Sequence, residues 1–308
     1  MKVLLIGLGI QGRKRFAVAG NQIVATVDPL VAEATYQRIE QVPLEAFEAA
    51  LVCTPDHAKF ELLRYLLAHG KHVLVEKPLL AEPEQVRELM ELARTAGVVC
   101  YTAYNHRFEP HIARLKQMLD RGTIGPVYLV RGFYGNGTAR DVKCSSWRDA
   151  GLGVLSDLGS HLLDITLFLF GEPRGTFQAW SATSFENRAF DHVLFGMKER
   201  PVLELEATLL SWRNTFQLDV YGEGGSAHLE GLCKWGPSTL TVRQRMLPSG
   251  KPREEATIVA CPDPTWESEY RHFTRLCELG GTNLDNDLWI MKALQDVAHS
   301  LSEAVPSS

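Results

Sequence analysis

Residues 3–12 read Val-Leu-Leu-Ile-Gly-Leu-Gly-Ile-Gln-Gly, a short apolar run followed at once by a Gly-x-Gly-x-x-Gly pattern. The run predicts a buried strand, and the residues after it predict the start of a helix. In such a turn the first glycine permits the bend, the second lets a pyrophosphate approach the backbone, and the third lets the helix pack closely on the strand. Because N–H groups at a helix start bind phosphates, the predicted cofactor-binding residues are Gly7, Gly9, Ile10, Gln11 and Gly12.

An acidic residue follows at the position where a dinucleotide-binding unit needs one. Asp28 lies 21 positions beyond Gly7, at the end of the next predicted strand. Its carboxylate would accept hydrogen bonds from both ribose hydroxyls and repel a 2′-phosphate, so NAD is favoured over NADP. No arginine follows immediately to receive an extra phosphate. The alternative is a solvated turn aspartate before Pro29.

The overall composition excludes several classes of protein. The chain has 308 residues, of which 45% are hydrophobic and 22% charged, enough for two moderate cores. The net charge of -5 gives no basic surface for nucleic acid. No apolar run reaches the roughly 18 residues of a membrane span, and the N-terminal run ends at Gly7, unlike a signal peptide. We therefore expect a cytoplasmic protein with neither nucleic acid nor membrane as a partner.

Cysteine and histidine positions argue against a metal. The six cysteines include no Cys-x-x-Cys pair, and the ten histidines form no clustered ligand pattern. We expect reduced thiols and no metal site.

The two parts of the chain have different patterns. Residues 1–120 alternate short apolar runs with helical patterns, which predicts a parallel sheet covered by helices on both faces, a doubly wound domain. The predicted strands are 3–6, 23–27, 50–53, 72–75 and 98–101, and the predicted helices include 60–68, 83–96 and 111–120.

Residues 121–308 contain consecutive strand patterns joined by short turns, which predict a mostly antiparallel sheet in an α+β domain. The family resemblance described below implies that this sheet is open and that the domain binds substrate and mediates oligomerisation. The predicted strands are 177–185, 192–197, 202–210, 216–221, 227–232, 240–245 and 256–260. The predicted helices are 154–170, 266–279 and 287–302, and we expect the last two to pack back on the first domain.

Four motifs resemble one known family. Glu76-Lys77-Pro78 ends a predicted strand, and in this context the sequence is similar to the Gfo/Idh/MocA family of glucose-fructose oxidoreductase and inositol dehydrogenase. The segments 52–56 (Val-Cys-Thr-Pro-Asp), 104–110 (Tyr-Asn-His-Arg-Phe-Glu-Pro) and 153–164 (Gly-Val-Leu-Ser-Asp-Leu-Gly-Ser-His-Leu-Leu-Asp) resemble the family's fourth-strand loop, fifth-strand exit and catalytic helix. The resemblance covers residues 1 to about 171, and the remainder matches only in architecture.

The resemblance implies a fold and a reaction. The fold is a Rossmann domain followed by an open sheet whose free face commonly mediates oligomerisation, here into a homodimer or homotetramer. The reaction is reversible hydride transfer between a sugar-type hydroxyl carbon and NAD(P). The family's motif lysine corresponds to Lys77, and its helix aspartate and histidine correspond to Asp157 and His161. These three are the predicted catalytic residues, and they are also expected to bind substrate.

The chemistry assigns each of the three a role. Removing hydride from a carbinol carbon requires a base for the hydroxyl proton, and we assign His161 as that base. Asp157 assists proton transfer or orientation, and Lys77 stabilises the developing alkoxide. Asp157, His161 and Asp164 are spaced i, i+4 and i+7 and so share a face of the predicted helix. The alternative is that His161 and Asp164 only hydrogen-bond nearby loops.

Other positions are assigned by resemblance alone. The residues expected to line the cofactor crevice are Thr54, Pro55, His57, Glu76 and Lys77. Asn105 is expected beside the nicotinamide or the substrate, and Trp147 and Arg148 are expected to meet cofactor or substrate. Packing or loop support is an equally good interpretation for Thr54, Pro55, His57, Asn105, Trp147 and Arg148.

The sequence also departs from the family pattern. Only 24 residues separate Asp28 from Cys53, so the usual crossover helix is almost absent, which would open one flank of the adenine pocket. Lys59 stands where a histidine is frequent. An unusual loop at 134–140 precedes the catalytic helix, and we hypothesise that Arg140 and Lys143 bind an anionic part of the substrate, such as a carboxylate or a nucleotide diphosphate. A solvated loop is the alternative.

Together these observations predict an NAD-dependent oxidoreductase acting on a hydroxyl carbon of a sugar, sugar acid or sugar nucleotide. One alternative is an NADP-linked carbonyl or imine reductase. Another is a non-catalytic regulatory or sensor protein that binds NAD without turnover. The presence of Lys77, Asp157 and His161 together argues against the sensor, because a sensor needs no positioned base.

Overall fold

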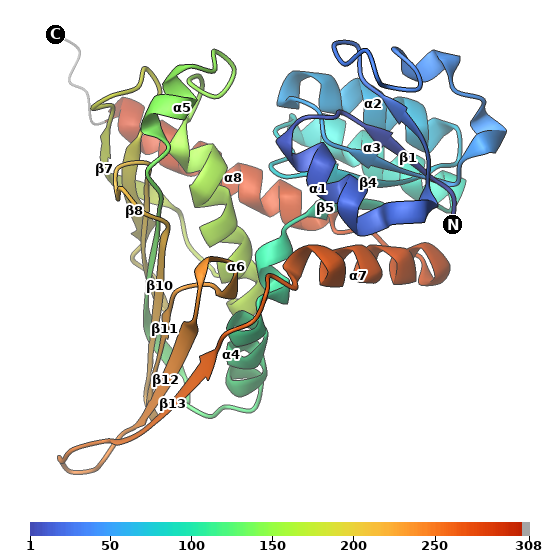
Figure 1. Cartoon of the computed structure of the whole chain (residues 1–308). Helices are drawn as coiled ribbons and strands as arrows, with labels where there is room; N and C mark the ends of the chain where they lie inside the picture. Colours follow the sequence, from blue (N-terminus) through green and yellow to red (C-terminus); the bar gives the residue numbers. More distant parts are fainter. Residues whose placement is uncertain (304–308) are drawn as a thin grey trace, which may run out of the picture. The chain divides into compact units, whose positions relative to one another are not determined.

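The computed structural model describes residues 1–303, which divide into two compact units (Figure 1). Met1–Asn105 and Thr265–Met291 form the first unit, and His106–Pro264 and the chain from Lys292 onward form the second. Each unit has its own sheet.

The first unit is a Rossmann-type domain with five parallel strands in the order β2-β1-β3-β4-β5. The strands are β1 (Val3–Ile6), β2 (Ile23–Val27), β3 (Ala49–Val52), β4 (His72–Glu76) and β5 (Cys100–Ala103). The helices are α1 (Ile10–Ala19), α2 (Asp56–Ala68), α3 (Pro83–Ala96), α7 (Thr265–Leu279) and the first part of α8 (Leu284–Glu303). This arrangement confirms the predicted α/β class.

Alternate residues of the central strands serve the two faces of this sheet. Leu4 and Ile6 of β1 pack into one apolar core with α2 and α3, while Val3 and Leu5 pack into another with α1 and α7 (Figure 1). All four β1 residues are buried, which explains why the strand is continuously apolar rather than alternating.

The crossover between β2 and β3 is short, as predicted. Residues 28–48, all of which the structure describes, contain the short 3₁₀ turns η2 (Ile39–Gln41) and η3 (Leu44–Ala46) but no α-helix. Another prediction was wrong by two residues: the strand placed at 98–101 is β5, Cys100–Ala103. Val98 instead donates its N–H to the carbonyl of Ala93, which completes the end of α3.

The second unit contains an eight-stranded sheet in the order β13-β12-β11-β10-β6-β9-β8-β7. Every pairing in it is antiparallel except that of β6 with β9, which confirms the predicted mostly antiparallel sheet. The strands are β6 (Val127–Gly135), β7 (Gln178–Thr183), β8 (His192–Met197), β9 (Val202–Thr208), β10 (Thr215–Gly222), β11 (Gly225–Glu230), β12 (Ser238–Gln244) and β13 (Arg253–Val259).

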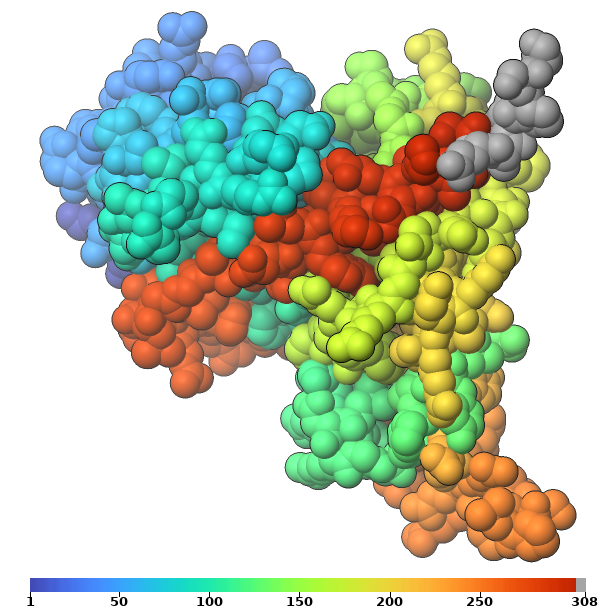
Figure 2. Space-filling view, turned by 180° about the vertical axis from the view of Figure 1, so that it is seen from behind, coloured from blue at the N-terminus to red at the C-terminus, as the bar shows by residue number. Residues whose placement is uncertain are grey.

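Helices cover one face of this sheet. The helical segments are η4 (Asn105–Phe108), α4 (Pro110–Asp120), α5 (Ala139–Lys143), the π-helical η5 (Leu155–Gly159), α6 (Ser160–Phe170) and η6 (Cys233–Trp235). α6 and η5 contact β6, and α4 packs against α6 and β12. The hairpin that joins β12 to β13 extends beyond α4 as the orange projection in Figures 1 and 2.

Candidate active site

The glycine loop after β1 has the geometry that its sequence predicts. Gly7 has a φ of +90°, and a Cβ on Gly12 would lie 1.9 Å from the carbonyl oxygen of Gly7. The first glycine is thus required by the turn and the third by close packing of α1 on the loop. Gly9 differs, because a Cβ there would meet nothing within 4 Å. Of the three glycines, Gly9 therefore has open space, free of protein atoms, beside its backbone.

The start of α1 fits a dinucleotide phosphate. Gly9 is its N-cap and offers no side-chain cap, and the first turn contains no acidic residue. The first N–H groups of a helix carry partial positive charge and bind anions. Ile10 and Gln11 are exposed on this turn, where they leave the backbone accessible.

Asp28 is held by backbone N–H groups at the end of β2. One carboxylate oxygen accepts from Leu8 at 2.7 Å, and the other accepts from Leu30 at 2.9 Å and Val31 at 3.2 Å. The bond to Leu8 links the carboxylate to the glycine loop. A carboxylate has about four acceptor positions, so Asp28 can still receive a ribose hydroxyl.

The loop after β3 adds a further group that suits a cofactor. Thr54 Oγ1 is buried and has no hydrogen-bond partner among residues 1–303, as expected of a hydroxyl that awaits a ligand. Pro55 is the N-cap of α2, and His57 is exposed in its first turn.

Glu76, before the predicted catalytic lysine, belongs to a buried charge cluster. Arg15 of α1 donates to Glu76 at 2.6 Å and to Glu269 of α7 at 2.6 Å, and its guanidinium lies 4.4 Å from the centre of the Trp266 ring. Arg15 is 1% exposed and Glu269 0%. Burial alone would lower the pKa of Arg15, but the two carboxylates raise it by more. The net pKa is therefore above the usual value, and the charge of Arg15 is fixed. The contact with Arg15 anchors Glu76 directly before the Lys77 turn. The expectation that Glu76 also lines the cofactor crevice stays a prediction.

Lys77 is partly exposed at the carboxyl end of β4, where ligands bind in open α/β sheets. The Lys77–Pro78 peptide bond is cis. Buried Lys59 donates to the Pro78 carbonyl at 2.5 Å and to Asp56 at 2.6 Å, and so ties α2 to this turn. Burial lowers the pKa of Lys59, although Asp56 opposes that shift. The long side chain of Lys59 is thus used to reach a carbonyl of the Lys77–Pro78 turn.

Asn105 is buried at the end of the first unit's main segment. Its amide nitrogen donates to Thr265 Oγ1 at 2.7 Å, which fixes the start of α7. This contact is the support role that the sequence analysis left open beside cofactor contact.

In the second unit, a cross-bonded loop leads into the predicted catalytic helix. The buried carboxylate of Asp149 accepts from the backbone N–H groups of Arg188 and Ala189 at 2.7 and 2.9 Å. Gly153 has a φ of +53°, and a Cβ there would lie 2.3 Å from the Phe190 carbonyl oxygen. The loop and the chain before β8 are therefore locked together where the helix begins.

One continuous helix was predicted at 154–170, but the structure has a π-helical segment followed by an α-helix. Asp157 lies in η5, which is π-helical, and His161 lies in the first turn of α6. In a π-helix each turn contains more residues, so the α-helical spacing that placed Asp157 on the same face as His161 does not apply, although His161 and Asp164 both lie in α6. π-turns occur frequently at functional sites.

Asp164 has a structural partner. Arg107 donates from Nε and Nη2 to both oxygens of Asp164, which is fully buried. Burial raises the pKa of Asp164, while the guanidinium of Arg107 opposes that shift. This bidentate pair is the alternative left open for Asp164, and it excludes Asp164 from the set of groups available to a substrate.

His161 is surrounded by aromatic and charged groups of its own unit. Its ring stacks on that of His106, with centroids 4.0 Å apart and planes at 23°, and the Tyr134 ring centre lies 5.8 Å away. His161 is 7% exposed. Burial, and next the negative charge of Asp157, raise the pKa of Tyr134, so its hydroxyl stays protonated.

Arg148 pairs with Asp157, Nη2 to Oδ2, at 3.6 Å, with both side chains about one-third exposed. Trp147 beside it is exposed, as are Arg140 and Lys143 in the short helix α5. The structure therefore brings Arg148 and Asp157 together and leaves Arg140 and Lys143 at the surface.

Several residues with functional positions escaped the sequence analysis. Arg15, Glu269, His106, Tyr134 and Lys234 were not assigned a role. Two of them carried a signal, since His106 lies inside the motif at 104–110 and Tyr134 begins the unusual segment at 134–140. The others meet their partners across large sequence separations that no local pattern reports.

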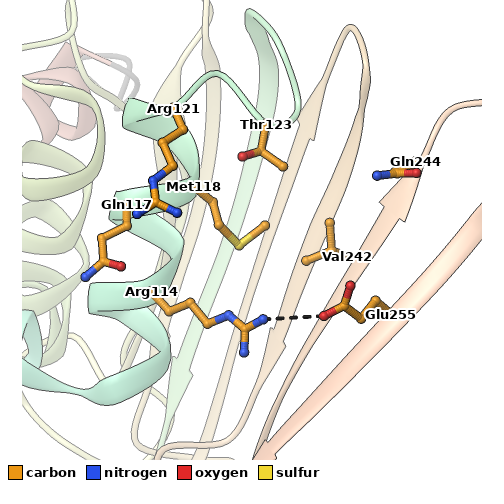
Figure 3. A pocket seen from close by; sticks show the side chains of 8 residues that line it. All are labelled: Arg114, Gln117, Met118, Arg121, Thr123, Val242, Gln244 and Glu255. Carbon is orange, nitrogen blue, oxygen red and sulfur yellow. Dashed lines mark ion pairs between the residues drawn. The ribbon is translucent and has the colours of Figure 1, made fainter.

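A separate hollow of about 230 Å³ lies between α4 and strands β12 and β13 (Figure 3). Figure 3 shows Arg114 reaching across it to Glu255, and the separation is 3.5 Å. None of the predicted site residues lines this hollow.

Residues 1–303 contain no cluster of three metal-ligating side chains and no helix long and apolar enough to cross a membrane. All six cysteines are free.

Sequence comparison establishes the family. A profile described as the oxidoreductase family with an NAD-binding Rossmann fold matches residues 1–104, and one described as the GFO/IDH/MocA C-terminal domain matches residues 112–228. The chain therefore belongs to the GFO/IDH/MocA family of oxidoreductases, and its first unit is an NAD-binding Rossmann domain.

Individual relatives match over part of the chain. Levoglucosan dehydrogenase of Pseudarthrobacter phenanthrenivorans is 31% identical over 126 residues, 39% of this chain and 32% of that protein. The scyllo-inositol 2-dehydrogenase (NADP(+)) IolW of Bacillus subtilis is 31% identical over 146 residues, 46% of this chain and 40% of that protein. The chain thus spans less than half the length of these relatives. A solved structure of levoglucosan dehydrogenase with NADH matches 98% of this chain and 97% of its own, with a TM-score of 0.84 and 20% identity, and supports the fold.

Proposed function

We propose that this protein is an NAD-dependent oxidoreductase that transfers a hydride between a hydroxyl carbon of a sugar, sugar acid or sugar nucleotide and the nicotinamide. The observation that carries the proposal is a buried imidazole, His161, four positions after the acid Asp157, in a chain whose other unit has open space for a phosphate at Gly9. A binding protein has no use for a base, whereas a dehydrogenase requires one.

The bound NAD would supply the hydride acceptor, and the chain's own residues would manage the proton. His161 Nε2 or Nδ1 takes the hydroxyl proton as the carbon loses hydride. Asp157, which pairs with Arg148, orients the imidazole of His161, the group that carries the proton. Lys77 donates a hydrogen bond to the same oxygen and stabilises its developing negative charge. The same groups run the reverse reduction by returning the proton.

We propose NAD as the cofactor rather than NADP. Asp28 is anchored by three backbone N–H groups, so its negative charge has a fixed position. A 2′-phosphate near this charge would be repelled. The segment from Pro29 to Gln37 contains no arginine or lysine that could compensate.

We also propose that Arg140 and Lys143 bind an anionic part of the substrate. Both are exposed on α5, whose carbonyl at Ala139 accepts from Asn187 Nδ2 at 3.1 Å. This contact holds α5 near the loop before β8, which in turn is bonded to the start of η5. The double substitution Arg140→Ala and Lys143→Ala should raise KM for a charged substrate at least tenfold, and the control pair Lys198→Ala and Lys251→Ala should not. Equal KM values would reject the assignment.

We propose a homodimer or homotetramer formed through the uncovered face of the second unit's sheet. Four of its outward charged side chains are paired within the chain, Arg131 with Glu204 at 2.5 Å and Arg243 with Glu254 at 2.7 Å, so association would not leave these charges unpaired. Light scattering should give two or four times the chain mass. A Phe133→Glu variant, which adds a charge to this face, should give the monomer.

The central experiment follows NADH formation against a panel of free sugars, polyols, sugar acids and sugar nucleotides. We expect turnover with at least one class, and losses of at least a hundredfold in kcat for Lys77→Ala and for His161→Ala. Lys251→Ala and His69→Ala serve as controls at exposed positions that have no assigned role in the site. Turnover that survives both catalytic substitutions would overturn the assigned roles. NADH binding without turnover across the panel would favour a sensor, and activity with NADPH alone would favour the NADP-linked reductase.

A further inference from the structure

Lys234 occupies a rigid turn close to the predicted base. It lies in the one-turn helix η6, between Gly231 with a φ of +76° and Gly236 with a φ of +134°. Only glycine adopts such angles readily, so the turn has a defined shape. The ammonium lies 4.4 Å from the centre of the Trp235 ring, and this contact fixes its position further.

The ammonium contacts the partner ring of His161. Lys234 Nζ lies 2.9 Å from His106 Nε2 and 3.4 Å from the Tyr134 hydroxyl. A lysine ammonium can only donate, so Nε2 of His106 must be the acceptor. A ring whose Nε2 accepts carries its proton on Nδ1 and has no net charge. The contact therefore selects both the tautomer and the protonation state of His106.

The state of His106 affects His161 because the two rings stack. At a centroid separation of 4.0 Å, two imidazolium cations would repel each other strongly in a buried site. A neutral His106 avoids that repulsion at the moment when His161 accepts a proton.

One buried carboxylate holds both partners in place. Glu109 caps α4, directly after the segment that contains His106, by accepting from the N–H groups of His111 and Ile112 at 2.7 and 3.1 Å. Its other oxygen accepts from the N–H of Cys233, next to Lys234, at 3.3 Å. The His106 segment and the Lys234 turn are thus fixed by the same side chain.

We propose that Lys234 is a positioning residue that acts through His106: it holds the stacked imidazole pair in the neutral state in which His161 can serve as the base. This inference rests on the proposed function for the role of His161, but the state of the pair is measurable without substrate. Other charged or titratable groups of the second unit near the pair are Tyr134, Asp157 with its partner Arg148, and the Arg107–Asp164 pair. In each of the last two, an arginine and a carboxylate pair with each other. Among these groups, Lys234 is the cation that directly contacts one of the two stacked imidazoles.

The first test is nitrogen NMR of the histidine rings in protein labelled at histidine. We expect the Nδ1–H tautomer for His106 in the wild-type chain, assigned by comparison with His106→Gln. In Lys234→Met, which keeps the apolar stem and removes the charge, the titration midpoint of the pair should rise by about one pH unit. Lys234→Arg should keep the wild-type midpoint, and Lys251→Met is the control at an exposed site.

The second test is the pH profile of alcohol oxidation. The acidic limb of kcat/KM should move to higher pH in Lys234→Met by the same amount as the NMR midpoint, while the rate on the alkaline plateau should stay within threefold. A purely structural role would lower the plateau and leave the limb in place.

The outcomes separate this inference from the proposed function. An Nε2–H tautomer for His106 in the wild-type protein, or an unchanged midpoint in a folded Lys234→Met, would overturn the role of Lys234. The expected NMR result combined with no turnover on any substrate would retain the charge control and reject the dehydrogenase. If Lys234→Met does not fold, the wild-type tautomer still decides.

Discussion

Replacement of Arg15 tests whether the buried charge cluster organises the first unit. Arg15→Met keeps an apolar stem of similar length but removes the guanidinium that contacts Glu76 and Glu269, each at 2.6 Å. Both carboxylates would then be buried without this cation. The matched control is Arg13→Met on the same helix, where the arginine is exposed.

The expected cost follows from the burial of the three groups. Removing one partner of a buried ion pair costs about 3–5 kcal/mol. Two pairs share one guanidinium here, and their contributions are not additive, so we expect a loss of about 4 kcal/mol rather than twice that value. Natural domains are stable by only about 5–15 kcal/mol, so the loss should be plain. Arg13→Met should cost less than about 0.5 kcal/mol.

The variants of the partners should rank in a definite order. Glu269→Gln keeps the Arg15–Glu76 contact and replaces one carboxylate by an amide that can still accept from Arg15, so it should cost about 1 kcal/mol. Replacing all three by Met, Gln and Gln removes every charge and should recover most of the loss from Arg15→Met.

The assay is urea unfolding followed by circular dichroism, because urea does not screen charges as guanidinium chloride does. The gap between wild type and Arg15→Met should narrow as the pH falls, since protonation relieves the two stranded carboxylates. If Arg15→Met is no less stable than Arg13→Met at neutral pH, the reasoning fails.

Three further outcomes are expected. Gly9→Ala should leave the stability unchanged, because its Cβ meets only open space, but should weaken NADH binding roughly tenfold, about 1.4 kcal/mol. Gly12→Ala should cost at least about 2 kcal/mol of stability, because its Cβ would overlap a carbonyl. Calorimetry measures the binding and urea unfolding the stability, and equal stabilities of the two variants would contradict the geometry. Asp28→Asn should reduce the preference for NADH over NADPH by roughly tenfold in the ratio of the two Kd values, and an unchanged ratio would show that the charge does not select the cofactor. Partial burial lowers the pKa of His72, whose Nδ1 accepts from the Val99 N–H at 3.0 Å. The contribution of neutral His72 to the free energy of unfolding is therefore complete above pH 6.5 and is lost as the pH falls through the lowered pKa. His72→Gln should flatten that part of the curve of unfolding free energy against pH, and a curve that keeps its slope would assign the effect to another group.

The parts of the fold that could be predicted are those in which a local pattern and the tertiary environment agree. α3 was predicted with its observed bounds, because Pro83 suits a first turn and Gly97 ends the helix with a φ of +66°. The strands of the parallel sheet were found because burial on both faces makes them continuously apolar. β13 was placed too late, at 256–260 instead of Arg253–Val259, because the first residues of this edge strand are charged.

The cofactor loop could be predicted for the same reason, and much of the remaining site could not. Two of the three glycines, Gly7 with its positive φ and Gly12 with its close approach to the Gly7 carbonyl, are required by backbone geometry within six residues, which a sequence displays directly. The partners of Asp164 and Glu76, by contrast, lie 57 and 61 residues away. Resemblance could point to His161, but nothing in the sequence indicates that a lysine 73 positions later would contact the ring stacked on it.

The two units use buried charge in different ways, and the difference bears on function. The Arg15 cluster has short contacts to two carboxylates, which keep the pKa of Arg15 raised and its charge fixed, so it serves as a support for the Lys77 turn. The cluster at His161 combines an ammonium, two imidazoles and a phenol, of which only the imidazoles change charge near neutral pH. A cation that contacts one imidazole lowers the cost of keeping both neutral, and a site that must accept a proton gains from that arrangement. A purely structural core would gain nothing from it, since apolar side chains of the same volume would pack there without the cost of burying a charge.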